Sequence, residues 1–354
     1  MNDLASARDL SHTKFNVANM LKGIIMKAII APKYGSPEVL ELRDVETPSP
    51  KPNEVLVKVC ASSLNAADFE ILRGAWSTRF LSPLRPKYKI PGSDVAGQVE
   101  AIGSEVTEMQ PGDDVMEDLF IYGHGAFAEY VCAPENVFTR KSVSMSFAEA
   151  ATYPQAAIIA LQALRGKKRI ELGHKVLING GGGGMGTFAI QIAKYYGAEV
   201  TGVDSALKLD MMWSIGADHV LDYRQEDFTK RGKCYDVIVD TVARRSLSEY
   251  KRSLNPRGLF VMVGGSRSAI FQATFLGPLY SLDGEKHLGL NLWSEPYNQE
   301  DMSFLEELFE AGDVRPVIDR CYPLRQVPEA LLYLEGGRAL GKVVTTMESD
   351  SLSF

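Results

Sequence analysis

Glycines with a distinctive spacing stand at the middle of the chain, in a run of five at residues 180–184. Gly181, Gly183 and Gly186 match the fingerprint that binds a dinucleotide between a strand and a helix. The first glycine permits a tight turn, the second lets the backbone approach a pyrophosphate, and the third lets helix and strand pack closely. Backbone N–H groups at the helix start then face the phosphates. We assign this role to the whole turn, which comprises Gly181, Gly183, Gly184, Met185 and Gly186.

Residues beyond the turn complete the predicted nucleotide site. Asp204 closes the next strand-like run, where its carboxylate would accept a hydrogen bond from a ribose hydroxyl. Lys208 follows it and could reach either a ribose or a phosphate. Tyr223 ends the following strand and is expected near the adenine. Val242 and Gly264 follow the next two strands, at the edge where the nicotinamide half of a dinucleotide would lie.

A parallel sheet is needed to position these residues, and the second half of the chain predicts one. Strand-like runs recur roughly every twenty residues, as in βαβ units. They begin near Lys175, Glu199, His219, Asp236 and Leu259, and a further run covers His287 to Trp293. Residues 26–153 instead contain short strands punctuated by Pro and Gly, which indicates a β-rich domain. The predicted fold class is therefore α/β, with a doubly wound parallel sheet after a β-rich domain.

Composition limits the partners and the location. The net charge of −7 argues against a nucleic-acid-binding surface. The four cysteines form no CxxC pair and indicate a reducing compartment. No apolar run is long enough to span a bilayer, and residues 1–25 have no continuous apolar core, so a secretory signal is not expected. We expect a cytoplasmic protein, with organelle targeting by residues 1–25 left open.

Several strings that occur in order along the chain carry a family resemblance. They are Val55-Leu-Val-Lys-Val, Asn65-x-x-Asp68, Pro91-Gly-Ser-Asp-Val-Ala-Gly-Gln-Val, Gly125-Ala-Phe-Ala-Glu-Tyr, Asp236-Val-Ile-Val-Asp-Thr-Val and Gly341-Lys-Val-Val. On these strings the chain resembles the medium-chain dehydrogenase/reductase superfamily. It is similar to the zinc-independent quinone oxidoreductase branch, near the reticulon-4-interacting-protein and chloroplast-envelope homologues. The resemblance implies a GroES-like catalytic domain from residues 26–154 and 296–354, with a Rossmann domain at 155–295 between them. Residues 1–25 fit this pattern poorly, and we expect them to form a disordered extension.

The resemblance also bears on metal binding. Zinc alcohol dehydrogenases of this superfamily hold a catalytic metal with Cys, His and Cys, and a Glu follows the His. The matching positions here are Asn65, Ser93, Asp94 and Gln155. Amides and a hydroxyl are poor zinc ligands beside thiolate and imidazole, so we predict no metal. Without a Lewis acid to stabilise an alkoxide, the favoured reaction is hydride transfer from NAD(P)H to a quinone or an α,β-unsaturated carbonyl.

Three residues are candidates for the catalytic site. Asn65 replaces a metal ligand and could donate a hydrogen bond to the developing oxyanion, although an Asn that only caps a loop would look the same. Asp68 either holds this loop or acts directly. Trp76 stands where quinone reductases often carry Tyr, and it either walls the substrate pocket or packs in the core. Lys342, in the closing segment, could reach the cofactor or lie on the surface.

The choice of cofactor, the oligomeric state and the class of activity each rest on only a few residues. Asp204 would repel a 2′-phosphate, and Leu207 stands where NADPH-dependent relatives often carry Arg, so NADH is favoured. The apolar run from Leu288 to Trp293 could form a paired sheet edge, and we expect a homodimer as the resemblance implies. Two alternatives stay open: metal-independent oxidation of an alcohol, and a low-turnover cofactor-binding protein of crystallin or assembly-factor type.

Overall fold

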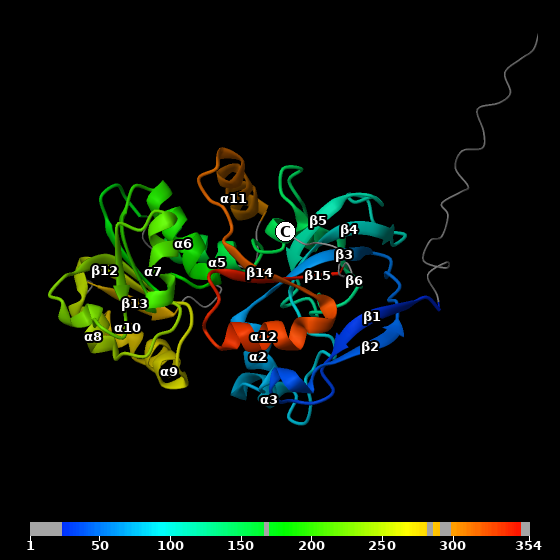
Figure 1. The fold of residues 1–354 in the computed structure, drawn as a ribbon, viewed down its shortest axis with the longest axis horizontal. Helices are drawn as coiled ribbons and strands as arrows, with labels where there is room; N and C mark the ends of the chain where they lie inside the picture. The colour runs from blue at the N-terminus through cyan, green and yellow to red at the C-terminus, as the bar shows by residue number, and fades with distance from the viewer. Residues whose placement is uncertain (1–22, 166–169, 282–285, 291–298, 348–354) are drawn as a thin grey trace, which may run out of the picture.

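The computed structural model describes residues 23–165, 170–281, 286–290 and 299–347. Its described strands form two large sheets, which lie in separate halves of the molecule, and one two-stranded ribbon (Figure 1). Helices α5 (Ala156–Arg165) and α11 (Gln299–Ala311) lie towards the middle, between these halves. The predicted nucleotide-binding turn belongs to one half, and Asn65 belongs to the other.

The left half of Figure 1 contains a six-stranded sheet in which every pairing is parallel. Its strands are β8 (Lys175–Asn179), β9 (Glu199–Asp204), β10 (His219–Asp222), β11 (Tyr235–Asp240), β12 (Leu254–Met262) and β13 (His287–Leu290). The order is β10-β9-β8-β11-β12-β13, so the winding reverses between β8 and β11. This order confirms the predicted Rossmann sheet. β12 begins earlier than predicted, because exposed Pro256 and Arg257 interrupt its apolar pattern.

Helices cover this sheet with apolar faces. α6 (Gly184–Tyr195) follows the glycine turn and buries Phe188, Ala189, Ile192 and Ala193, which recur at helical spacing. This face packs against α5, β8 and β9. The other helical segments of this half are η3 (Ala206–Lys208), α7 (Leu209–Ser214), η4 (Phe228–Lys230), α8 (Leu247–Arg252), α9 (Arg267–Phe275) and α10 (Gly277–Tyr280).

The right half contains a seven-stranded, mostly antiparallel sheet. Its strands are β3 (Glu54–Leu64), β4 (Asp94–Ile102), β5 (Asp114–Asp118), β6 (Tyr130–Pro134), β7 (Thr139–Arg140), β14 (Ile318–Pro323) and β15 (Lys342–Thr346). The order is β14-β15-β3-β4-β5-β7, and β6 also pairs with β3. β15 lies antiparallel to β3, with Val343 opposite Leu64, so the last described strand completes a sheet that begins early in the chain. This closure agrees with the implied GroES-like domain.

The remaining elements flank this second sheet. They are β1 (Ile25–Ile30) and β2 (Glu41–Glu46), which form the ribbon, and η1 (Pro37–Val39), α2 (Ala66–Leu72), α3 (Trp76–Leu81), η2 (Glu135–Val137), α4 (Phe147–Ala150), η5 (Leu324–Gln326) and α12 (Val327–Glu335). α12 packs against α2 and β15. Within the described ranges, no helix combines the length and the apolar character needed to cross a membrane.

One apolar core connects the two halves. It joins Val176 of β8 and Phe188 of α6 with Ala61 of β3 and Val344 of β15. Phe309 of α11 belongs to the same core, and α11 packs against α5. Residues on both sides of the expected domain boundaries therefore share a core, and the positions of those boundaries stay a prediction.

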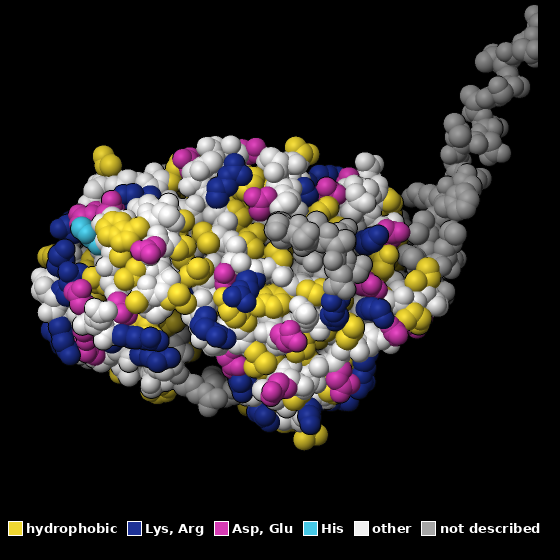
Figure 2. All heavy atoms as spheres, in the orientation of Figure 1, with side chains coloured by type: hydrophobic (Ala, Val, Ile, Leu, Met, Phe, Trp, Pro, Cys, Tyr) yellow, Lys and Arg dark blue, Asp and Glu magenta, His cyan; other side chains and the backbone are white. Residues whose placement is uncertain are grey.

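The surface carries the features that bear on partners. Figure 2 shows one face, on which basic and acidic side chains are interspersed with hydrophobic ones. β13 lies at the edge of the parallel sheet, where the apolar run proposed for dimer pairing begins. The second part of that run, residues 291–293, lies outside the described residues.

Candidate functional site

The turn between β8 and α6 has the geometry that the glycine spacing predicts. Gly180 adopts a φ of +85°, in the left-handed region that glycine favours. A Cβ on Gly186 would lie 2.1 Å from the Gly180 carbonyl oxygen, so this position requires glycine for the turn to pack on the helix. A Cβ on Gly183 would lie 3.4 Å from the same oxygen, which is an ordinary contact. Protein packing therefore does not require glycine at Gly183, and the open space there suits close approach of a pyrophosphate.

Asp204 and Lys208 both lie against this turn. Asp204 Oδ2 accepts a hydrogen bond from the Gly182 N–H at 3.0 Å. Lys208 Nζ lies 3.7 Å from Asp204 Oδ1, and the lysine side chain is only 7% exposed. A Cβ on Gly182 would lie 2.5 Å from Lys208 Cδ, which places the lysine stem against the turn. Lys208 is therefore a buried residue, and its ammonium offsets part of the charge of Asp204.

The other predicted nucleotide residues lie where the parallel strands end. Tyr223 follows β10 and Val242 follows β11, and both side chains are exposed. Gly264 follows β12, where a Cβ would lie 2.5 Å from the Thr241 carbonyl oxygen. In a doubly wound sheet, ligands bind at this edge, near the reversal between β8 and β11. The glycine cradle and the exposed Tyr223 and Val242 fit a nicotinamide dinucleotide, while each individual contact with it stays a prediction.

Asn65 and Asp68 shape the start of helix α2. Asn65 is the N-cap residue, with extended backbone angles. Asp68 Oδ2 accepts a hydrogen bond from the Asn65 N–H at 2.7 Å, the interaction that an acidic residue makes in a capping box. Asp68 thus holds the loop, and a direct catalytic role for it stays a prediction. Trp76 begins α3, but its side chain lies outside the described part of the structure, so its role at the pocket also stays a prediction.

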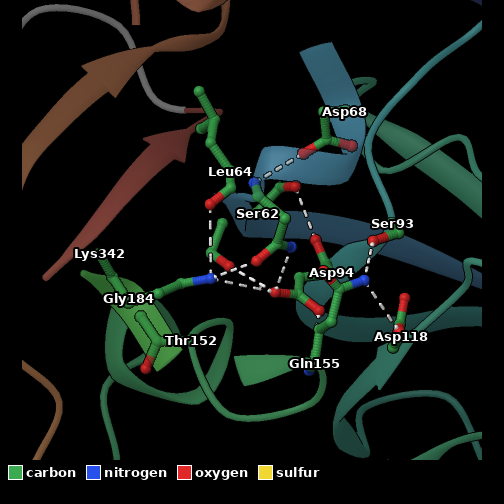
Figure 3. Close-up of polar contacts among 12 residues, drawn as sticks. Ser62, Leu64, Asp68, Ser93, Asp94, Asp118, Thr152, Gln155, Gly184 and Lys342 are labelled. Atoms are coloured by element: carbon green, nitrogen blue, oxygen red, sulfur yellow. Dashed lines mark hydrogen bonds and ion pairs between the residues drawn. The ribbon is translucent and has the colours of Figure 1, made fainter. Parts of the chain in front are cut away.

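Lys342 lies inside a buried polar cluster (Figure 3). Its Nζ donates to Asn65 Oδ1 at 2.7 Å and lies 3.5 Å from Asp94 Oδ2. Asn65 Nδ2 donates to the same Asp94 oxygen at 2.9 Å. The alternative that Lys342 is a surface lysine is therefore wrong, because the side chain is only 2% exposed and its ammonium is directed at Asn65 and Asp94. Contact between Lys342 and the cofactor stays a prediction.

The residues at the metal-ligand positions come together, but their polar groups already bind one another. Asp94 Oδ1 accepts from the Gln155 N–H at 3.1 Å, and Gln155 Nε2 donates to Ser93 Oγ at 3.3 Å and to Asp118 Oδ2 at 3.2 Å. Across the described ranges, no three His, Cys, Asp or Glu side chains are grouped so as to hold a metal ion. The Lys342 ammonium also places a positive charge beside Asp94. The side chains at these positions are therefore not suited to bind zinc.

Burial dominates the electrostatics of this cluster. It raises the pKa of Asp68 and of Asp118 to about 7. It also raises the pKa of Asp94, against the opposing effect of the Lys342 ammonium. Burial lowers the pKa of Lys342, and the Asp94 and Asp68 carboxylates oppose that shift. The cluster therefore holds one cation among several acids, and its proton content changes near neutral pH.

Strand β15 brings the glycine turn and the polar cluster together. The Gly341 N–H donates to the Gly182 carbonyl at 3.0 Å. A Cβ on Gly184 would lie 2.7 Å from Lys342 Cδ, so the lysine stem packs on the first residue of α6. Since the Nζ of the same lysine contacts Asn65, a single side chain spans the space between the predicted pyrophosphate turn and the predicted catalytic amide.

A cavity of about 430 Å³ opens beside Asp68. Its walls come from α2, α3 and several loops, and they include Ala67, Ala75, Tyr88, Phe120 and His124. The His124 ring lies 5.0 Å from the Tyr88 ring and 5.2 Å from the Phe120 ring. Burial lowers the pKa of His124 to about 4, so the imidazole is neutral at neutral pH. Asp68, Glu70 and Lys87 also line the cavity, but its aromatic walls suit a flat ligand.

Sequence reasoning grouped Asn65 with Asp94 at the positions that match the zinc site, and the structure adds Lys342 to this group. It missed Ser63, whose Oγ donates to Asp94 Oδ2 at 2.5 Å, and Asp118, which accepts from Gln155. The available signal for Ser63 was a pair of serines in the apolar second half of β3, residues 59–64, because buried hydroxyl groups need hydrogen-bond partners. Asp118 gave no comparable signal, since an acid at a strand end is usually exposed.

Comparisons with known proteins agree with this geometry. A model of the alcohol dehydrogenase GroES-like domain matches residues 51–142, and one described as zinc-binding dehydrogenase matches residues 215–345. The chain is 33% identical over 330 residues to the 2-methylene-furan-3-one reductase of Solanum lycopersicum, covering 90% of this chain and 78% of that protein. It is 31% identical over 336 residues to the chloroplast envelope quinone oxidoreductase homolog of Arabidopsis thaliana, covering 92% and 99%.

A second organelle protein and a solved structure extend the likeness. The mitochondrial NAD(P)H oxidoreductase RTN4IP1 of Mus musculus is 32% identical over 364 residues, covering 92% of this chain and 90% of that protein. The quinone oxidoreductase from Coxiella burnetii superposes with a TM-score of 0.81 at 29% identity, covering 92% of this chain and 100% of that one. With its doubly wound sheet and a GroES-like sheet closed by β15, the chain belongs to the medium-chain dehydrogenase/reductase superfamily of nicotinamide-dependent oxidoreductases, in the quinone oxidoreductase branch.

Proposed function

We propose that this protein transfers a hydride from NADH to a quinone or an α,β-unsaturated carbonyl without the help of zinc. The observation that carries the proposal is the buried Asn65–Lys342–Asp94 cluster, in which an amide stands at a metal-ligand position and an ammonium lies beside it, next to the glycine turn. The names of the related quinone oxidoreductases and of the furanone reductase support the same substrate class.

The residues around the cluster account for the hydride step, and the anion that this step leaves takes its proton from solvent water. When bound, the dihydronicotinamide supplies the hydride, and addition to a quinone or enone leaves negative charge on the acceptor oxygen. Asn65 Nδ2 carries two hydrogens, of which one is donated to Asp94. The second N–H is the donor that we assign to the developing oxyanion. A delocalised enolate or hydroquinone anion requires less stabilisation than an alkoxide, so an amide donor can replace a Lewis acid.

The cavity beside Asp68 is the acceptor site in this proposal. Its aromatic walls would hold a flat ring, and Asp68 connects it to Asn65 through the helix cap. His124 is neutral and Asp68 is desolvated, so the cavity favours an uncharged acceptor over an anion. Positioning the acceptor next to the Asn65 amide would contribute as much to the rate of hydride transfer as any chemical group.

A panel of acceptors tests the function directly. Protein purified without a nickel column is mixed with NADH and either 9,10-phenanthrenequinone or a simple enone, and cofactor oxidation is followed by absorbance. We expect turnover with both acceptor classes, unchanged after dialysis against a zinc chelator. Loss of activity on chelation, with recovery on adding zinc, would overturn the zinc-independent reaction. Tight NADH binding without turnover on the whole panel would instead favour the cofactor-binding protein, and oxidation of simple alcohols would favour the dehydrogenase.

NADH rather than NADPH is the cofactor that we propose. The Asp204 carboxylate lies at the turn, where it suits a ribose hydroxyl and disfavours a 2′-phosphate. Because Lys208 offsets part of this charge, the preference should be modest. A ratio of kcat/KM values above one for NADH over NADPH is expected, and a ratio below one would contradict this choice.

We also propose a homodimer that acts in the cytoplasm. β13 is an edge strand of the parallel sheet, and an uncovered edge invites pairing with a second copy. Light scattering at micromolar concentration should give twice the 38.9 kDa mass of one chain, and the monomer mass would contradict pairing. A fluorescent fusion at the C-terminus checks the location, and an organelle pattern that depends on residues 1–25 would correct it.

A further inference from the structure

We propose that Lys342 is a positioning residue whose ammonium sets the orientation of the Asn65 side-chain amide for hydride transfer. The inference rests on the function proposed above, in which this amide donates a hydrogen bond to the acceptor. It assigns to Lys342 an action through Asn65 rather than a direct contact with the acceptor.

The amide orientation matters because an Asn side chain can turn over and exchange its oxygen with its nitrogen. An ammonium can only donate hydrogen bonds, and an ionised carboxylate can only accept them. Lys342 Nζ lies 2.7 Å from Asn65 Oδ1, and Asp94 Oδ2 lies 2.9 Å from Asn65 Nδ2. Lys342 and Asp94 together permit one orientation of the Asn65 amide, with Oδ1 towards the ammonium and Nδ2 towards the carboxylate. In this orientation the second N–H of Nδ2 is left for the acceptor.

Asp94 cannot set this orientation alone, because its charge depends on Lys342. Ser63 and the Gln155 N–H fix the carboxylate in place, but both are neutral donors. The other titratable groups that bear on Asp94 are Asp118, Asp68 and Glu117, which are all acids. Lys342 is thus the cation of the cluster within the described residues. Without it, Asp94 would take up a proton, and a protonated carboxyl could donate to a turned-over amide.

The lysine stem adds a second constraint on the amide. It packs on Gly184 at the start of α6, while the backbone of the preceding Gly341 donates to Gly182. The ammonium therefore cannot drift away from Asn65 unless β15 moves relative to the glycine turn. Substituting Met for Lys342 keeps most of this stem and removes only the donor and the charge.

A double-mutant cycle between Lys342→Met and Asn65→Ala tests the inference. Alone, Lys342→Met should lower kcat at least about tenfold, as expected when an oxyanion donor is mispositioned, with the Kd for NADH changed less than about twofold. In the Asn65→Ala background the same change should have little further effect on kcat, because no amide is left to orient. Lys342→Arg, which keeps charge and donors, should retain more activity than Lys342→Met.

Lys208→Met serves as the matched comparison, since it removes the other buried lysine at the same turn. That variant should change cofactor affinity and leave the Asn65 coupling intact. Equal losses from Lys342→Met in both backgrounds would overturn the inference, whereas absent turnover in the wild type would overturn the proposed function instead. If the wild type shows no turnover, or if Lys342→Met unfolds the protein, the same double-mutant cycle is measured as Tm values from thermal unfolding. Lys342→Arg is then included in the set of variants. Additive changes in Tm there would show that Lys342 and Asn65 do not act together.

Discussion

Two buried lysine–aspartate pairs flank the glycine turn, and they are built differently. Lys208 and Asp204 belong to one short segment, at a separation of 3.7 Å, and the Asp204 side chain retains 13% exposure. Lys342 and Asp94 are 248 residues apart in sequence, their charged atoms lie 3.5 Å apart, and the Asp94 side chain is fully buried. The first pair faces the expected cofactor, while the second also holds Asn65.

The difference shows how one kind of ion pair can serve two purposes. A pair with residual exposure leaves its carboxylate available to a ligand, so it can select between cofactors. A fully buried pair exposes almost none of its charge to solvent, and its desolvation is costly unless every polar atom is bonded. The ammonium of the second pair therefore acts on its protein neighbours, and the two pairs should respond differently to substitution.

Gly186→Ala should produce the largest effect, because it disrupts the turn that both pairs flank. The added Cβ would lie 2.1 Å from the Gly180 carbonyl oxygen, so strand and helix must separate. We expect loss of measurable NADH binding by fluorescence titration and a destabilisation of about 1–3 kcal/mol or more in chemical unfolding. Gly183→Ala is the control: its Cβ has room, so Tm should hold while NADH affinity falls.

Asn65→Ala tests the acceptor side alone. Removing one oxyanion donor typically lowers the rate by about a hundredfold or more. The expected result is a lower kcat at saturating acceptor with an unchanged Kd for NADH, measured by steady-state kinetics and binding titration. An unchanged kcat would remove Asn65 from the catalytic site and would leave the Lys342–Asp94 pair a structural feature only.

Asp204→Ser tests the cofactor side alone and should have a smaller effect. The serine removes a negative charge, and Lys208 is then free to attract a 2′-phosphate. We expect kcat/KM for NADPH to rise about tenfold relative to NADH, which corresponds to 1.4 kcal/mol. The kcat for NADH should change little, and a variant that gains nothing with NADPH would contradict the role given to Asp204.

Asp68→Asn should leave the loop in place, since the amide oxygen can still accept the Asn65 N–H, and should have the smallest effect on activity. Burial raises the pKa of Asp68 to about 7, so the folded protein holds a proton that the unfolded chain releases from about pH 4 upward. The wild type should therefore lose stability relative to Asp68→Asn as the pH rises from 5 to 7. Thermal unfolding of both proteins from pH 5 to 7 measures this loss. A Tm difference between wild type and Asp68→Asn that does not change with pH would contradict the raised pKa.

The cofactor half could be predicted from the sequence because its signals are local. The glycine spacing, Asp204 and the strand starts all lie within one βαβ repeat or recur with its period. The Lys208–Asp204 pair is likewise a contact between neighbours in sequence. Even so, burial of Lys208 was not predicted, because it depends on the stem packing on Gly182 and no pattern in the sequence reports that contact.

The acceptor half could be predicted only in outline. Asn65 and Lys342 were singled out, but their hydrogen bond spans nearly the whole chain and depends on the register of β15 against β3. Ser63 and Asp118 were missed because their partners, Asp94 in β4 and Gln155 just before α5, are distant from them in sequence. The cavity beside Asp68 has walls from separate loops without a shared motif, so its shape follows only from the folded backbone.

The position of β15 has a consequence for synthesis of the protein. Strand β3 pairs with β15 at Leu64 and Val343, and all of the described parallel sheet lies between them in sequence. On the ribosome, the dinucleotide turn can therefore form while one edge of β3 is still open and Asn65 has no ammonium beside it. Domains complete in order of emergence, and unpaired strand edges are sites of misassembly. The residues proposed for hydride transfer are therefore complete only after the last described strand has been synthesised.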